Sequence, residues 1–200
     1  MNTENTSLFP TNPSITLYDP LGELLGAGDG KFTYTFDDAV KLSGHACPTV
    51  AGAFLLVKVA LDNLYPDGET PQRGGVSVEL SAAHDEGVNG PLSQVFTLLT
   101  GAAAAQGFHG LAGQYVRKDL LRFNVDGAGL VTFKRLDTGE KISLTYSPAT
   151  FPPAPGIGEK MGQVLSGNHD PELKKAFRTA WRQRVLDILE DGGKSTVHIA

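Results

Sequence analysis

The sequence has a single cysteine, Cys47, among its 200 residues, so no disulfide can form within the chain. It also lacks a long uncharged apolar run. The most apolar stretch, residues 50–61, contains Lys58 and is followed by Asp62, which makes it too short and too charged to span a bilayer. Residues 1–12 lack the basic region and apolar segment of a secretory signal. We therefore expect a cytoplasmic protein with no membrane partner.

Positive charge is also scarce. The chain has 17 Lys and Arg against 22 Asp and Glu, a net charge of −5. The basic residues form only a local group in the last long helical segment, so we expect no nucleic-acid partner. A hydrophobic content of 40% is enough for a full core and is typical of an ordinary globular chain.

The chemistry of the sequence centres on residues 42–49, Leu-Ser-Gly-His-Ala-Cys-Pro-Thr. Pro48 presets φ for a first helical position and predicts a helix from there to about Tyr65. The residue before a proline tends to be extended, and in extended backbone residues i and i+2 point the same way. His45 and Cys47 should therefore face one site. The positive end of the helix dipole favours the thiolate of Cys47, the form that attacks electrophiles and binds soft metals.

The remaining pattern predicts an α+β fold, with buried helices packed on a mostly antiparallel sheet. Apolar residues and Pro91 predict a second helix over about 92–105, and alternation predicts a strand over 75–82. Three further segments separated by glycine turns are typical of an antiparallel meander. They span 120–126, 130–136 and 141–146.

We expect three parts in the chain. They are an N-terminal leader (1–30), a core domain (31–147), and a Pro-rich linker with a C-terminal helix and strand (148–200). Asp170 and Pro171 predict the start of that helix, which continues to about Glu190. Trp181 lies on its apolar stripe, a pattern that favours packing against the core or a second copy of the chain. We expect a homo-oligomer, specifically a homodimer.

A second helix start resembles the first, because the predicted strand over 75–82 leads into His84, Asp85 and Glu86 just before Pro91. The two helix starts could face a common pocket. Two protein ligands are too few for zinc, which takes three in an open catalytic site and four in a structural one. The candidate third ligands are His84 and, in a glycine-flanked loop, His109. Asp85 and Glu86 are candidates for a ligand, an outer-shell partner or a general base.

The run of residues 36–52 resembles the opening of the FmdE-like family, which takes its name from one of the proteins of formylmethanofuran dehydrogenase. That opening has a helix, a Gly-His-x-Cys-Pro element and a small-residue apolar helix, and residues 44–48 match the element. Residues 98–101 and the meander through 138–139 are similar to the later half of that family. The resemblance covers roughly residues 32–146.

This resemblance implies an α+β domain that binds a divalent metal, usually zinc, with His45 and Cys47 as ligands. Ser43 stands where family members commonly have another histidine. The cysteine-rich zinc module that ends many members is absent, since the chain has no second cysteine.

Three hypotheses follow. The first is a metal-binding pocket, with zinc as the expected ion, which acts on a small-molecule substrate if it is catalytic; Cys47, Asp85 and Glu86 are then the catalytic candidates. The second is a metal-free thiol enzyme or redox sensor in which His45 activates Cys47. The third is a non-catalytic partner or scaffold protein whose Trp181 helix mediates assembly. The sequence leaves open whether the protein is an enzyme.

Overall fold

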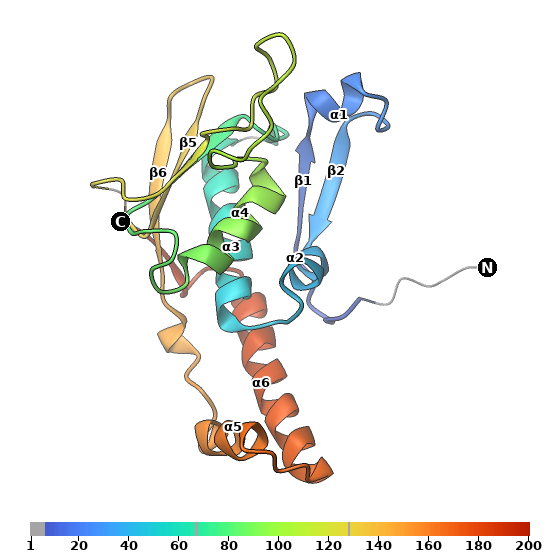
Figure 1. Cartoon of the computed structure of the whole chain (residues 1–200), viewed down its shortest axis with the longest axis vertical. Helices are drawn as coiled ribbons and strands as arrows, with labels where there is room; N and C mark the ends of the chain where they lie inside the picture. The colour runs from blue at the N-terminus through green and yellow to red at the C-terminus, as the bar shows by residue number, and fades with distance from the viewer. Residues whose placement is uncertain (1–6, 67, 128) are drawn as a thin grey trace, which may run out of the picture.

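The computed structural model describes residues 7–66, 68–127 and 129–200, and it confirms the α+β class (Figure 1). The helices are α1 (Pro20–Leu24), α2 (Phe36–Ser43), α3 (Pro48–Leu64), α4 (Asn89–Thr100), the 3₁₀ turn η1 (Pro148–Thr150), α5 (Ile157–Leu165) and α6 (Pro171–Asp191). The strands are β1 (Ser14–Tyr18), β2 (Lys31–Thr35), β3 (Val76–Leu80), β4 (Leu121–Arg122), β5 (Val131–Arg135), β6 (Lys141–Tyr146) and β7 (Val197–Ile199).

The strands form two sheets. β1 and β2 pair antiparallel, with Ile15 opposite Tyr34. The larger sheet has the order β4-β3-β5-β6-β7, and all its neighbouring strands are antiparallel except β3 and β4. The expectation of a mostly antiparallel sheet is confirmed. In Figure 1 the hairpin of β1 and β2 lies on one side of α3 and the larger sheet on the other.

The predicted meander differs from the structure at its first strand. In place of a strand over 120–126, β4 has two residues, and its Leu121 pairs with Val78 of β3 in parallel. β3 lies between β4 and β5, so these two strands are not neighbours. Asn124 adopts a left-handed φ of 56°, which is incompatible with a continuing strand. The antiparallel part of the sheet therefore consists of β3, β5, β6 and β7.

Helix α3 lies at the centre of the core. It packs against α4, β6, α6 and α2, and Val50, Phe54 and Leu55 are at most 1% exposed. A helix that is apolar around most of its circumference has to be enclosed in this way. Pro48 occupies its first turn as predicted. Cys47 is the N-cap, with the extended angles φ −150° and ψ 168°.

Helix α4 starts earlier and ends earlier than the predicted 92–105. It ends at Thr100 because Gly101 adopts a left-handed φ of 75° and caps the helix. Since β3 returns from the end of α3 before α4 begins, α3 and α4 run in the same direction, and α4 also packs against α2. The two helix starts therefore lie at the same end of the fold.

The segments on either side of residues 31–147 contribute to the same hydrophobic core and sheets. In the expected leader, β1 and α1 form, Leu17 is buried, and Asp19 caps α1 by accepting from the Leu21 amide at 3.0 Å. The first six residues lie outside the described part of the chain. In the C-terminal part, Val185 and Ile188 are buried in the core cluster that contains α3, and β7 pairs with β6.

Helix α5 forms at the end of the expected Pro-rich linker and packs along α6. Together, α5 and the N-terminal half of α6 make an arm that projects from the rest of the molecule (Figure 1). Leu165 at the end of α5 is 79% exposed. None of the described helices is long and apolar enough to cross a membrane.

Candidate functional site

Cys47 is half-buried at the start of α3 and packs against the core. Within the described residues, its side chain makes no capping hydrogen bond to the helix. The backbone on both sides of it is held by residues far away in sequence. Trp181 Nε1 donates to the Ala46 carbonyl at 2.8 Å, and the Tyr146 hydroxyl donates to the Pro48 carbonyl at 2.7 Å. The position of Cys47 is therefore fixed by α6 and β6.

Tyr146 packs closely against α3 at Gly52, where an added Cβ would lie 2.4 Å from the ring carbons. Burial raises the pKa of Tyr146, so the phenol stays protonated at neutral pH and can donate to Pro48. Sequence reasoning missed Tyr146, because it is 98 positions from its partner and no local pattern marks it. The apolar stripe of its helix identified Trp181 in the sequence. That stripe predicted packing and did not predict the hydrogen bond to Ala46.

His45 is exposed, and its Nδ1 lies 2.9 Å from the Ser43 carbonyl oxygen. A carbonyl oxygen only accepts hydrogen bonds, so Nδ1 carries the proton and Nε2 keeps its lone pair. Metal-binding histidines usually show this arrangement, because a bond from the other ring nitrogen fixes the tautomer and the ring orientation. In the described part of the chain, no hydrogen bond joins this ring to the thiol of Cys47.

His84, Asp85 and Glu86 lie in the exposed turn between β3 and α4. The Asn89 side chain holds this turn by donating to the Ala83 carbonyl at 2.9 Å. His84 Nδ1 is 3.8 Å from the Asp85 carboxylate, which is too long for a hydrogen bond. The imidazole of His84 instead packs edge-on against the ring of Phe123, with centroids 6.0 Å apart.

A cavity of about 440 Å³ lies along α4, and its lining runs from Ser93 in the first half of that helix to Leu98 and Arg73 near its C-terminal end. Its lining includes Leu42 at the end of α2, Gln94 in α4, and Phe123. Leu42 is three residues before His45, and the ring of Phe123 packs against the imidazole of His84. Among the described residues, His45, Cys47 and His84 do not line this cavity, so it is not a pocket shared by the two helix starts.

His109 lies in the loop that follows the C-terminal end of α4, whereas Cys47 lies at the N-terminal end of α3. The carbonyl of Phe108 accepts from the amides of Arg117 and Lys118 and holds this part of the loop. The start of α3 with Cys47 is at the opposite end. The structure therefore does not bring His109 to the His45–Cys47 pair.

The donor types of His45 and Cys47 fit zinc, which binds imidazole nitrogen and thiolate sulfur. Two ligands, however, are fewer than the three or four protein ligands that zinc takes. Within residues 7–66, 68–127 and 129–200, no three His, Cys, Asp or Glu side chains form a group that could hold a metal ion. The pair could supply two of the ligands that zinc takes, and no third protein ligand is grouped with it in the described residues.

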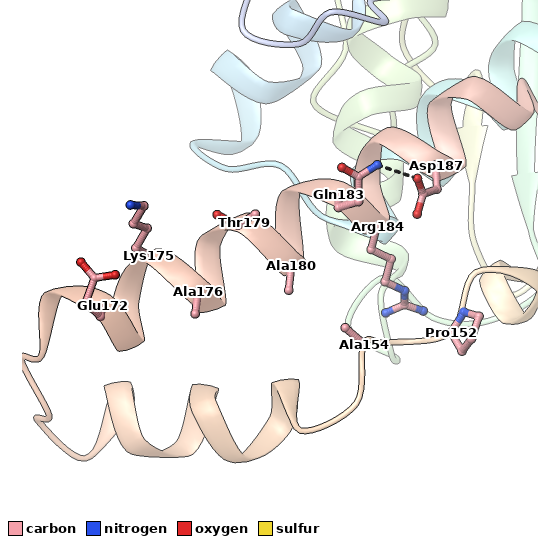
Figure 2. Close-up of a pocket in the computed structure, with 10 residues that line it drawn as sticks. All are labelled: Pro152, Ala154, Glu172, Lys175, Ala176, Thr179, Ala180, Gln183, Arg184 and Asp187. Carbon is pink, nitrogen blue, oxygen red and sulfur yellow. Dashed lines mark hydrogen bonds between the residues drawn. The ribbon is translucent and has the colours of Figure 1, made fainter.

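Another cavity lies on the arm and is separate from this pair. It has a volume of about 550 Å³ along α6 and is lined by Ala176, Ala180 and Arg184, with Ala154 of the preceding segment (Figure 2). Arg184 Nε donates to the Phe151 carbonyl at 2.7 Å and fixes that segment to α6. The cavity is an open groove along the arm.

No family model matches the chain, and no curated protein matches it. The function is therefore argued from its own residues and their geometry.

Proposed function

We propose that the protein is an FmdE-like metal-binding protein in which His45 and Cys47 hold a divalent ion, zinc in the first place. The observation that carries the proposal is the hydrogen bond from His45 Nδ1 to the Ser43 carbonyl. It leaves Nε2 free and oriented, as a metal ligand requires. The half-buried thiol at the start of a 17-residue helix is the second donor, and the helix dipole favours its thiolate form.

Two ligands leave open positions, and we assign these to water or a small-molecule substrate, because in the described residues His84 forms no three-residue metal group with the pair. The cavity of about 440 Å³ along α4 does not contain the pair, but it has the size of a small-molecule site, since such pockets range from about 300 to 1,000 Å³. Bound zinc would polarise a carbonyl or lower the pKa of water. Asp85 and Glu86 are exposed beside His84 and are the proposed groups that move the proton.

Fluorescence of Trp181, the only tryptophan, tests this proposal, because its indole donates to the carbonyl next to Cys47. Metal-free protein is titrated with Zn²⁺ and with Co²⁺, and Co²⁺ also reports thiolate binding through its absorption. We expect one ion per chain, and an affinity loss of at least tenfold in His45→Ala and in Cys47→Ala. His198→Ala, an exposed histidine of β7, is the matched control. Equal affinity in all four proteins would refute the proposal.

A metal-free reactive thiol is the second candidate function. It is favoured by the thiol at the helix start without a capping hydrogen bond and by the lack of a three-residue metal group among the described residues. The rate at which iodoacetamide alkylates Cys47 in the presence of a chelator, measured against pH, tests it. A midpoint well below about 8.5, the ordinary thiol value, supports an activated thiol. A midpoint near that value contradicts it.

We also propose that the protein acts in the cytoplasm as a homodimer formed through the arm. The arm, residues 157–181, projects from the rest of the molecule and exposes Leu165, an apolar side chain at the end of α5. An exposed apolar side chain on a projecting helix pair is a suitable contact for a second copy of the chain. Light scattering should show a dimer that Leu165→Glu combined with Lys174→Glu converts to a monomer. Lys141→Glu, outside the arm, should leave it unchanged, and a monomeric parent protein would refute this assembly.

A further inference from the structure

A pair of arginines lies at the end of the fold opposite to Cys47. Arg117 Nη2 donates to Asp19 Oδ1 at 2.7 Å, and Arg73 Nη1 donates to Asp19 Oδ2 at 3.0 Å. Asp19 and Arg117 are only 6% and 7% exposed. The amide of Gly74, next to Arg73, donates to the carbonyl of Thr100, which places the cluster at the C-terminal end of α4. Two guanidinium groups thus share one carboxylate in a mostly buried place.

The negative groups around this cluster do not balance its charge. Asp19 supplies one full charge. The end of α4 supplies about half a charge, through the Leu98 carbonyl, which accepts from Arg73 Nη2 at 3.2 Å. In the described part of the chain, Arg73 Nε and Arg117 Nη1 are buried without a hydrogen-bond partner. Burial lowers the pKa of Arg117, and the nearby Arg73 lowers it further, although Asp19 opposes both effects. The cluster therefore keeps an excess of positive charge.

A cavity of about 300 Å³ borders the two arginines. Gln72 and Val116 line it and are exposed at the surface, so the cavity is open to solvent. Tyr115 also lines it and has a φ of 58°, a left-handed conformation that is unfavourable for a bulky residue. Strain of this kind is found most often at ligand sites.

We propose that this cavity binds a small oxyanion, a carboxylate or a phosphate group, beside Arg73 and Arg117. Arginine is the residue best suited to such groups, because its planar guanidinium pairs with two oxygens at once. The anion supplies the negative charge that Asp19 and α4 leave missing. The site is separate from the His45–Cys47 pair and does not depend on the function proposed for it.

Thermal unfolding in sodium phosphate and in sodium acetate, each compared with sodium chloride at the same ionic strength and pH, tests this site. A ligand that binds only the folded state raises the unfolding midpoint. We expect a rise beyond that in chloride. A response to phosphate alone identifies a phosphate site, and a response to acetate identifies a carboxylate site. Equal midpoints in all three salts would overturn the proposal.

Gln72→Glu provides the variant, because Gln72 is exposed and its replacement puts a carboxylate into the cavity without removing an arginine. It should weaken anion binding at least tenfold and raise the midpoint in chloride. Gln114→Glu is the matched control, an exposed glutamine next to Tyr115 but outside the cavity lining, and should change binding less than twofold. Cys47→Ala should keep the full anion response. An undiminished response in Gln72→Glu would place the anion elsewhere and overturn the assignment.

Discussion

Replacing Gly52 by alanine tests how tightly α3 packs against β6 at the candidate site. Alanine is normally the better helix residue, by about 0.8–1.0 kcal/mol. At Gly52 the new Cβ would lie 2.4 Å from two ring carbons of Tyr146, far inside van der Waals contact. The ring has to move away, and this movement breaks the 2.7 Å hydrogen bond from its hydroxyl to Pro48.

The size of the effect follows from these opposing contributions. Overpacking of a core costs about 1–3 kcal/mol, and the lost hydrogen bond costs about 0.5–1.5 kcal/mol. After the gain in helix propensity is subtracted, Gly52→Ala should lower the free energy of unfolding by about 1–3 kcal/mol. The melting temperature of a chain of this length falls by about 2–4 °C per kcal/mol.

Urea unfolding followed by far-UV circular dichroism measures this change. The double variant Gly52→Ala with Tyr146→Leu removes the ring, so in that background alanine should be neutral or stabilising. Gly162→Ala in α5 is the matched control, because nothing lies within 4 Å of its added Cβ, and it should stabilise by about 0.4–1 kcal/mol. If Gly52→Ala stabilised the parent protein, the argument that Tyr146 leaves no room for a side chain at position 52 would be refuted.

Three further changes have defined outcomes. Trp181→Phe removes the donor to the Ala46 carbonyl and should lower the unfolding free energy in urea by about 1 kcal/mol and speed alkylation of Cys47. Burial by itself would raise the pKa of Asp191, but hydrogen bonds from Ser195 and Thr196 outweigh it and lower that pKa. The resulting stabilisation is present above the unfolded-state pKa of about 3.9 and is lost as the pH falls through the lower folded-state value. Asp191→Asn should therefore destabilise the fold by about 1 kcal/mol at pH 7 and less at pH 3 in urea titrations. Removing residues 148–200 takes Val185, Ile188 and Leu189 out of the core, about 1.5–3 kcal/mol each, so circular dichroism should show a truncated chain that no longer folds.

Local signals explain which elements the sequence predicts well. Pro48 acts on its own φ and on the residue before it, so the start of α3 and the extended Cys47 follow from two adjacent residues. The segment that forms β4 carries no comparable signal, because its pairing with β3 depends on residues about 40 positions away. Helix α5 has glycines at 158 and 162 and is stabilised by its packing on α6, which propensity does not predict.

The candidate site likewise contains residues that local signals identify and residues that they do not. The motif identifies His45 and Cys47 because their spacing and the following proline are local, and the structure adds the Ser43 carbonyl that orients the imidazole. Tyr146 and Trp181 reach the motif from 98 and 135 positions away. No periodic pattern marks such distant hydrogen bonds, so residues of this kind appear only when the fold is known.

The parallel course of α3 and α4 gives the two ends of the fold opposite electrostatic character. Both helices begin at the end that carries Cys47, where their dipoles favour negative charge such as a thiolate. Helix α4 ends beside the arginine pair, where its dipole favours positive charge and helps to hold two guanidinium groups with one carboxylate, Asp19. An anion that binds there adds negative charge to that of Asp19. A metal ion at the other end depends instead on the thiolate of Cys47. The two sites should therefore respond independently, and a variant of either should leave ligand binding at the other unchanged.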